Sequence, residues 1–503
     1  MAATQTNKDE IVISDFDKGI GPSVYLGFGD IRNLDILSSP GVATLNNKVT
    51  KRSGTIVDST VNWFVRDPVN TGSLVAYDAG GSFYNTNDSG STWGELAGAP
   101  ASGGGQGAVI WKNYLVSAYA SKLVLYGTLT STAIWRDSWK TIDQDNSWHP
   151  MIISRNDGKI YGGAGRYLFS LEEASGQTFD AGNPNTYTFT QQALDLPAGY
   201  SIKTLEELGN NLMIGTIAAA GHGALKIADI FPWDRSSVSF NLPLSLNVNG
   251  VHALLTVNNI LYILAGLEGK IYSSNGVQTA TIGQIPLSIT NTGSGTTRNI
   301  IPSPGAFINY KERPTFGFLY AVGVWSLLPT RGGNVLNLEH TISPGNTTDT
   351  SIGALLPLSQ DEILIGWKSS DINTLYGIDK TDNTGRVSAF TGTFTPGYFE
   401  SALYHIGNYH NKRTFREIEF QLDRPMVIGQ GVALSYRTSL NTDFLIIGTY
   451  THSTTLTTQI GAKQSHVVIP GIPSTEFVQL RVALAPGTSD ANASPRLREV
   501  RLR

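Results

Sequence analysis

The feature that most constrains the fold is a pattern that repeats from about residue 55 to residue 395. Each unit holds an apolar run, a polar turn, a second apolar run, a few small residues and an apolar run with an aromatic residue. Successive units open about 42 to 55 residues apart, the spacing of four-stranded propeller blades. The pattern therefore predicts a β-propeller. The units open at Val61, Gly107, His149, Thr204, Val251, Gly305 and Gly353.

Polar turns inside these units favour hairpins, because Asn, Asp and Gly accept the backbone angles that a tight turn requires. The seven units predict a seven-bladed propeller, with six or eight blades as alternatives because the repeats diverge. A β-solenoid and two stacked sandwiches are the other candidate architectures, but each unit holds three or four strands, which disfavours a solenoid. The turn residues are Asn113, Asn156-Asp157-Gly158, Asn210-Asn211, Asn258-Asn259 and Gln360-Asp361.

The composition agrees with an all-β chain. Glycine occurs 54 times in 503 residues, and charged residues make up 15% of the chain, against an average of about 25%. Abundant Ser, Thr, Asn and Gly indicate many tight turns and few helices. The net charge of -4 predicts neither a broadly basic nucleic-acid binder nor an acidic tail, although a local basic patch is compatible with it.

The chain has no cysteine, which excludes disulfides, cysteine nucleophiles and thiolate metal sites. The N-terminal ten residues contain no apolar stretch of the kind found in secretory signals, so we expect the protein to fold where it is made. No apolar run approaches 18 residues, so no membrane span is expected.

Three regions are expected. Residues 1–55 read as an irregular, extended N-terminal arm, and residues 56–398 hold the propeller units. Residues 399–503 alternate apolar and polar side chains with period two, which predicts about six longer strands in a β-sandwich of jelly-roll type. The alternation is clearest where Ile418, Phe420 and Leu422 share one face.

One turn inside the first unit matches a recognisable pattern, the Asp box, of the form Asp88-x-Gly90-x-Thr92-Trp93. Asp88 is expected to accept hydrogen bonds from backbone N–H groups of the turn, and Gly90 to supply a positive φ. Trp93 is expected to fold over the turn. An ordinary Asn/Asp/Gly hairpin is the alternative interpretation, and in both cases the role is structural.

Asp boxes also occur in sialidases, so we considered a glycosidase. The Arg-Ile-Pro motif of that class is absent, and only one good Asp box is present. The chain also lacks a Gly-x-Ser-x-Gly nucleophile elbow and a phosphate-binding loop. We therefore assign no catalytic or cofactor-binding residue. Residues that could have served a sialidase-like site are Arg66, Arg136, Arg166, Arg235, Arg313, Tyr310 and Glu312.

Two oxygen-rich segments, Asp379–Gly385 and Asp143–Asn146, could in principle bind a metal. Neither has the spacing of an EF-hand with its terminal Glu, and solvated turns are the favoured interpretation. His405 and His410 would point to opposite faces of a strand. No metal ligand is assigned.

Basic residues gather at two places, and each could contact another subunit or DNA. Lys48, Lys51 and Arg52 end the N-terminal arm. The other group is C-terminal. On a regular strand two of its arginines would share one face and two the other, and a solvated edge strand protected by charge is the alternative interpretation. The C-terminal group consists of Arg496, Arg498, Arg501 and Arg503.

Two further segments carry a resemblance to a known family. The first is GFGDIRNLDILSSPGVATLNNKVTKRSG, which leads into the first unit. The second runs from Lys412 through Thr438, of the form Arg-x-Phe-x-x-Ile-x-Phe … Val-x-Leu-x-Tyr-Arg-Thr. With the divergent units between them, the chain resembles structural tail proteins of tailed bacteriophages that carry a β-propeller, of nozzle or hub type.

The resemblance implies a non-enzymatic virion component, made in the host cytoplasm and placed in the tail. It implies a cyclic homo-oligomer, sixfold most commonly, that contacts other tail proteins and encloses passing DNA, with no cofactor. A receptor- or carbohydrate-binding propeller that contacts host surface glycans is the alternative, and a sialidase-like glycosidase is a weaker one. The nine tryptophans are spread along the units, which favours core packing over one sugar-binding cluster.

Overall fold

The computed structural model describes most of the chain, and every structural statement below concerns the described part. It consists of residues 10–14, 16, 19, 28–39, 41–96, 107–127, 135–142, 148–222, 226–285, 299–319, 322–330, 333–343, 350–369, 375–387, 397–406, 412, 414–452, 465–488 and 490–503.

Short antiparallel strands follow one another in meanders through the middle of the chain. The first sheet consists of β6 (Val61–Arg66), β7 (Leu74–Asp78), β8 (Phe83–Thr86) and β9 (Gly94–Glu95). The second consists of β10 (Gly107–Trp111), β11 (Tyr114–Tyr119), β12 (Lys122–Tyr126) and β13 (Trp135–Thr141). The third consists of β14 (Met151–Ile153), β15 (Ile160–Ala164), β16 (Tyr167–Glu173) and β17 (Tyr187–Asp195), with a 3-10 turn η2 (Pro184–Thr186) before β17.

Four more sheets continue this plan. The fourth consists of β18 (Tyr200–Leu208), β19 (Asn211–Ala218), β20 (Asp229–Trp233) and β21 (Leu244–Ser245). The fifth consists of β22 (Val251–Val257), β23 (Ile260–Ala265), β24 (Lys270–Ser274) and β25 (Thr279–Gln284). The sixth begins with β26 (Ile301–Tyr310), β27 (Arg313–Leu319), β28 (Val324–Thr330) and β29 (Gly333–His340), and the last holds β30 (Thr350–Pro357), β31 (Ile363–Ser369) and β32 (Tyr376–Arg386).

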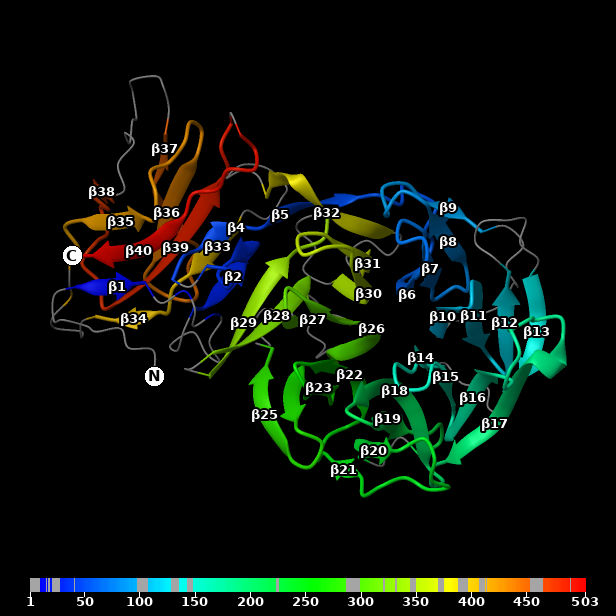
Figure 1. The fold of residues 1–503 in the computed structure, drawn as a ribbon. Coiled ribbons are helices and arrows are strands. Elements are labelled where there is room, and N and C mark those ends of the chain that lie inside the picture. Colours follow the sequence, from blue (N-terminus) through cyan, green and yellow to red (C-terminus); the bar gives the residue numbers. More distant parts are fainter. Residues whose placement is uncertain are drawn as a thin grey trace.

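These sheets form a closed ring (Figure 1). The first strand of each sheet lies innermost and contacts the first strand of the next, and β30 of the last sheet contacts β6 of the first. Four-stranded antiparallel sheets arranged in this way define a β-propeller, so the propeller prediction is confirmed. The expected unit openings fall at or close to the innermost strands, and Val61, Gly107 and Val251 are their first residues.

Two of the predicted hairpin turns have left-handed backbone at both central residues. Lys112 and Asn113 join β10 to β11 with φ of 52° and 66°, and Asn258 and Asn259 join β22 to β23 with φ of 51° and 61°. Consecutive positive φ values are the requirement of a type I′ turn, whose twist matches that of the strands it joins.

The N-terminal segment is not a free arm where the structure describes it, because its strands pair with distant parts of the same chain. Strand β5 (Asn47–Lys51) is the fourth strand of the last sheet, antiparallel to β32. Strand β2 (Asp30–Arg32) lies between β29 and β33 (Gly397–Glu400). Strand β1 (Ile11–Ile13) pairs with the last strand of the chain, and β3 (Leu34–Asp35) pairs with β4 (Thr44–Leu45).

The C-terminal part lies beside the ring (Figure 1). One of its sheets has the order β1-β40-β35-β38, and the other extends the sixth propeller sheet in the order β29-β2-β33-β39-β36-β37, with β34 beside β39. The strands are β34 (Tyr404–His405), β35 (Ile418–Leu422), β36 (Gly431–Arg437), β37 (Leu445–Thr451), β38 (Ser465–Val468), β39 (Phe477–Ala485) and β40 (Leu497–Leu502).

Both C-terminal sheets contribute to one hydrophobic cluster. Ile418, Phe420 and Leu422 are buried, as their alternation predicts, and they join a cluster that also holds Val482 of the other sheet. The same cluster includes Trp325 of the ring. The apolar core is therefore continuous from the C-terminal part into the propeller.

Four innermost strands carry a β-bulge. The register of β6, β18, β22 and β30 with the following strand slips by one residue, which leaves Asn62, Lys203, His252 and Gly353 as the extra residues. A bulge redirects the side chain of the inserted residue and strengthens the local twist.

No helix of the described residues is long and apolar enough to cross a membrane.

Candidate functional site

The Asp-box residues form the turn between β8 and β9. The carboxylate of Asp88 accepts hydrogen bonds from the backbone N–H groups of Ser91 and Thr92, both at 2.9 Å, and from the Thr92 hydroxyl at 2.6 Å. Gly90 has a φ of 81°, and the Trp93 indole donates to its carbonyl over 3.2 Å. This geometry is the one that the sequence pattern predicts.

The charge of Asp88 stabilises this turn. Its slight burial acts to raise the pKa, but hydrogen bonds from Thr86, Thr92 and Ser91 outweigh burial and lower the pKa to about 2. Hydrogen bonds to the ionised form of a carboxylate have this effect because they are lost on protonation.

The Asp-box turn also contacts the last sheet of the ring, which the sequence pattern could not indicate. The ammonium group of Lys380 on β32 donates to the Ser89 carbonyl over 3.2 Å. A Cβ atom added to Gly90 would lie 2.8 Å from the side chain of Leu364 on β31. The turn therefore packs across the junction where the first and last sheets meet.

The basic residues of the N-terminal segment lie on and next to the closing strand β5. Arg52 forms an ion pair with Asp382 at 3.5 Å. The ammonium group of Lys51 lies 5.5 Å from the centre of the Trp367 ring, and burial lowers its pKa while Asp379 acts to raise it. Lys48 is exposed to solvent.

The C-terminal arginines lie against carboxylates of the same chain. Arg496 and Arg498 both contact Asp423, at 3.0 and 3.3 Å. Arg501 and Arg503 both approach Glu10, at 3.9 and 2.9 Å. These partly exposed ion pairs reduce the positive potential that the sequence cluster would otherwise present.

The expected distribution of these arginines over two faces of β40 is wrong, because the strand is not regular. Glu499 pairs with Gln421 and Leu497 with Leu422, so Arg498 is the extra residue of a bulge. The bulge changes the alternation. Leu497, Val500 and Leu502 are all buried, and the arginines lie on the opposite face.

The residues considered for a sialidase-like site are not brought together. The guanidinium groups bind separate partners, and no two of them share one. Arg66 donates to the Pro357 carbonyl, Arg136 to the Ala181 carbonyl, Arg166 to Tyr167 and Asp195, Arg235 to Glu207 and Asn210, and Arg313 to Ser38 beside Glu339. Tyr310 is buried, and Glu312 lies in the β26–β27 turn.

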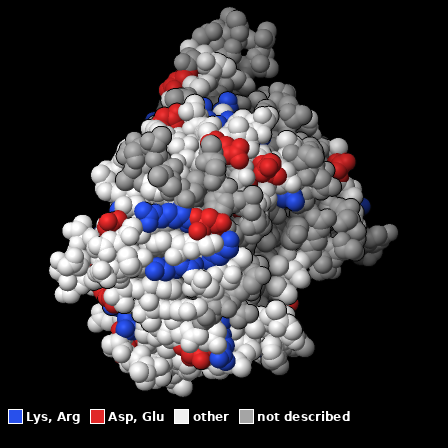
Figure 2. Space-filling view, turned by 90° about the vertical axis from the view of Figure 1, so that its right-hand side faces the viewer, with Lys and Arg blue, Asp and Glu red and all other residues white. Residues whose placement is uncertain are grey.

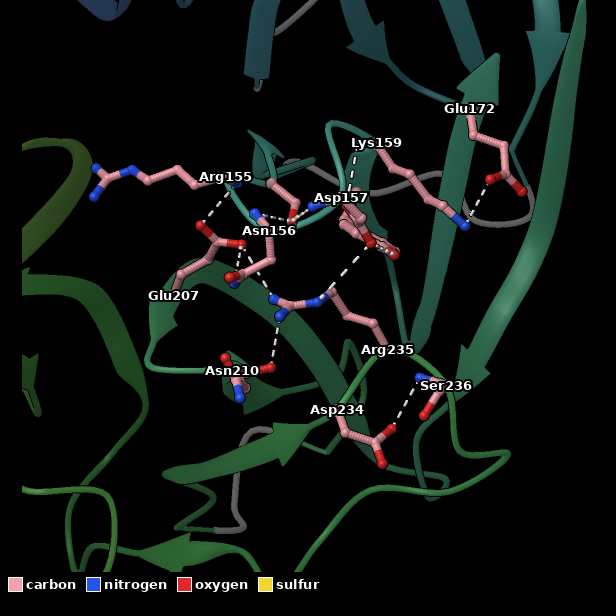
Figure 3. Close-up of polar contacts among 12 residues, drawn as sticks. Arg155, Asn156, Asp157, Lys159, Glu172, Glu207, Asn210, Asp234, Arg235 and Ser236 are labelled. Atoms are coloured by element: carbon pink, nitrogen blue, oxygen red, sulfur yellow. Dashed lines mark hydrogen bonds and ion pairs between the residues drawn. The ribbon is translucent and has the colours of Figure 1, made fainter. Parts of the chain in front are cut away.

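A polar network that sequence reasoning missed joins the third and fourth sheets (Figure 3). Its centre is Glu207 on β18, whose carboxylate accepts from Arg235 at 3.1 Å, from the Arg155 backbone at 3.0 Å and from the Asn156 amide at 3.3 Å. Arg235 also donates to the Asn210 carbonyl over 2.5 Å. The signal available in the sequence was the presence of charged residues at turns of consecutive units.

The same network continues outward through Asp157. Its carboxylate accepts from the Tyr161 hydroxyl at 2.8 Å and lies 4.0 Å from Arg235. Burial acts to raise the pKa of Asp157, but the bonds from Tyr161 and Lys159 lower it. Because the buried charges bind one another, the network is suited to holding two sheets together.

The interpretation of Asp379–Gly385 as a solvated turn is wrong, because the segment lies within strand β32, where Asp379 to Asp382 pair with β5. Asp379 is fully buried within β32 and accepts from the backbone and hydroxyl of Ser343, at 2.6 and 2.9 Å. Burial raises its pKa to about 6. The segment Asp143–Asn146 and His410 lie outside the described residues. Within the described ranges, no group of three or more His, Asp or Glu side chains is placed to hold a metal ion.

The surface in Figure 2 is mostly uncharged. Lysine and arginine side chains lie next to aspartate and glutamate over its described residues, and they form no broad single-sign surface. Broad positive potential is the usual property of a nucleic-acid-binding face. This view therefore offers no such face.

No family model and no curated protein matches the sequence. Among solved structures, the β-propeller domain of Cps50 (Swd1) from Myceliophteria thermophila is similar over 66% of this chain and 99% of its own, with 9% identity and a TM-score of 0.43. U3-55K is similar over 66% and 97%, with 13% identity and a TM-score of 0.46. YCF48 bound to D1 peptide is similar over 70% and 98%, with 10% identity and a TM-score of 0.46.

Proposed function

We propose that this protein is a non-enzymatic structural subunit that assembles with further copies of itself into a cyclic oligomer. The resemblance in the sequence supports the tail of a phage particle as the place of that assembly. Oligomers of this kind close by heterologous contacts repeated around an axis. Other tail proteins would then be the further partners.

The observation that carries the proposal is the ten-stranded sheet that links the ring to the C-terminal part. Strand β2 joins the two parts by pairing with β29 on one side and β33 on the other. Backbone pairing on both sides makes the connection rigid, unlike a flexible linker. A rigid two-part subunit is suited to an oligomer whose contacts repeat around an axis.

The far edge of this sheet supports self-assembly. Strand β37 pairs only with β36 within the described residues. Leu445 and Ile446 on β37 are 58% and 79% exposed. An apolar strand with an open backbone edge is a template for pairing with another chain, and we propose a second copy as its occupant.

The oligomeric state tests the proposal. Mass photometry of the full chain should give a multiple of the 54.1 kDa subunit mass. Ile446→Asp should shift the mass toward the monomer, whereas Val238→Asp should leave it unchanged, because Val238 is 99% exposed but lies in the ring. A wild-type monomer at micromolar concentration would contradict the proposal, and so would an oligomer that tolerates Ile446→Asp.

We further infer that the ring has seven blades and that the C-terminal part is a β-sandwich. Seven successive sheets in the described residues, with β30 against β6, support the blade number. The cluster shared by the two C-terminal sheets supports the sandwich. An electron-microscopy map of the assembly would count the blades directly, and six or eight would refute this inference.

A DNA contact remains a prediction of the resemblance. Lys48 is exposed, and the side chain of Arg498 is 62% exposed despite its contact with Asp423. Serine at both positions should reduce the affinity for duplex DNA and weaken its dependence on salt concentration. Unchanged binding would remove these residues as DNA contacts.

The tryptophans favour the scaffold over the glycan-binding alternative. Trp111, Trp233, Trp325 and Trp367 are all buried, so their rings are not available to stack on a sugar. A glycan array probed with the assembled protein would separate the two functions, because a scaffold should give no specific signal.

A further inference from the structure

Two basic side chains lie next to each other on the innermost strands, and neither belongs to the network described above. Lys203 is the bulged residue of β18, and His252 is the bulged residue of β22. These two strands are neighbours in the ring. The two side chains are only 5% and 7% exposed. The bulges thus bring two inserted basic residues together at the centre of the propeller.

Lys203 has no acidic partner among the described residues. Its ammonium nitrogen lies 3.3 Å from the centre of the Trp148 ring, a cation–π contact. Glu206 lies three residues beyond Lys203 on the same strand, a separation of about 10 Å at the usual rise per residue. The adjacent Glu207 forms an ion pair with Arg235. A charged Lys203 would therefore be buried without a carboxylate to balance it, a costly arrangement.

His252 also has an unused polar atom. Its Nε2 lies 3.1 Å from the Asn249 carbonyl oxygen and donates to it in the neutral ring. Its Nδ1 is buried and has no hydrogen-bond partner. Buried polar atoms without partners are rare in proteins and call for an explanation such as an absent ligand.

Two other innermost strands, β26 and β30, carry a glycine where a neighbouring strand comes close. Gly353 is the bulged residue of β30, and a Cβ atom there would lie 2.2 Å from the Val61 carbonyl oxygen. A Cβ atom on Gly305 of β26 would lie 2.1 Å from the Asn62 carbonyl oxygen. Neither β26 nor β30 therefore has room for a side chain at these two positions.

We propose that Lys203 and His252 form a binding site for an anionic oxygen group, a phosphate or a carboxylate, at the centre of the ring. A lysine ammonium supplies up to three donors, and a protonated histidine adds Nδ1–H. Both can face one oxyanion, whereas the absence of a carboxylate beside them among the described residues disfavours a metal ion. The Trp148 face closes one side of the ammonium.

Binding should be coupled to proton uptake. Burial lowers the pKa of Lys203 well below its usual value, and burial and the charge of Lys203 lower the pKa of His252 to about 4. An oxyanion favours the charged form of both groups. Two further titratable groups lie on the innermost strands or next to them. Glu206 is on β18, and burial raises its pKa to about 7. His149 is just before β14, and its Nδ1 lies 3.0 Å from the Gly163 carbonyl oxygen. Affinity should fall as pH rises, by up to about tenfold per unit for each proton taken up.

Calorimetric titration of the full chain with inorganic phosphate, and separately with acetate, tests the site. Repeating each titration in buffers of different ionisation enthalpy measures the protons taken up. We expect one site per subunit, with proton uptake, and the tighter of the two anions identifies the ligand class. Failure of both anions to bind would overturn the proposal, as would binding without proton uptake.

Two lysine variants locate the site. Lys203→Met keeps the length of the apolar stem and should abolish binding while raising the melting temperature of the empty protein. Lys226→Met, at an exposed lysine between β19 and β20 of the same sheet, should bind like the wild type. A folded Lys203→Met protein that binds phosphate and acetate normally would refute the assignment.

Discussion

Arg235 donates to Glu207 over 3.1 Å, and the two side chains are only 8% and 7% exposed. Removing one member of such a buried pair strongly destabilises the protein, because the other charge stays buried without its partner. We expect Arg235→Met to lower the free energy of unfolding by about 3 to 5 kcal/mol. Chemical denaturation followed by tryptophan fluorescence measures the loss.

The double variant Arg235→Met with Glu207→Gln is the control for this pair. Neutralising the remaining carboxylate should recover part of the lost stability, because no uncompensated charge is left. If the stability losses of Arg235→Met and Glu207→Gln simply add up in the double variant, the two residues are not coupled. That result would contradict the prediction.

Asp88→Asn tests the contribution of the charged Asp-box turn. The folded pKa of Asp88 is lowered to about 2, so its stabilisation is present above the unfolded value of 3.8 and is lost as pH falls toward 2. We expect a loss of about 1 kcal/mol at neutral pH, similar to that of a helix-capping carboxylate. The difference between wild type and variant should shrink between pH 4 and pH 2, measured by thermal unfolding.

Asp379 should show the opposite dependence on pH. Burial raises its folded pKa to about 6, so the folded state holds its proton more tightly than the unfolded state, and stability falls as pH rises from about 4 through 6. A shift of about two units corresponds to about 3 kcal/mol. Asp379→Asn should remove this part of the pH dependence. If the variant loses as much stability between pH 4 and pH 7 as the wild type does, Asp379 is not the source of that dependence.

Arg52→Pro tests the closure of the ring by the N-terminal strand. The backbone N–H of Arg52 donates to the Ile378 carbonyl over 2.8 Å, and proline has no such donor. We expect a loss of about 1 to 3 kcal/mol, because the buried Ile378 carbonyl is left without its donor. Arg52→Ala, which removes only the partly exposed ion pair with Asp382, should cost less than about 1 kcal/mol. Equal effects of the two substitutions would show that the backbone pairing contributes little.

Local features of the fold could be predicted from the sequence. The hairpin at Asn258-Asn259 was visible because two consecutive residues that tolerate positive φ stand between apolar runs. The buried face of β35 was visible because Ile418, Phe420 and Leu422 alternate with polar residues. Each signal is contained within a few consecutive residues.

Long-range pairing and bulges could not be predicted in the same way. Nothing within Asn47–Lys51 indicates that its partner is β32, because an edge strand of any sheet would show the same residues. The bulges at Lys203 and Arg498 leave no local mark either, and a bulge changes which residues share a face. The Glu207–Arg235 pair depends on how two sheets meet, which lies beyond any single segment.

The pairing of β5 with β32 and of β1 with β40 sets the order in which the protein can be completed. During synthesis the sheets of the ring emerge one after another, and each meander can form from neighbouring residues. The N-terminal strands emerge first but gain their partners last, because β32 ends at Arg386 and β40 at Leu502. Until β40 has been synthesised, the nascent chain therefore carries strands with open edges, and this is the period in which it most needs protection from aggregation.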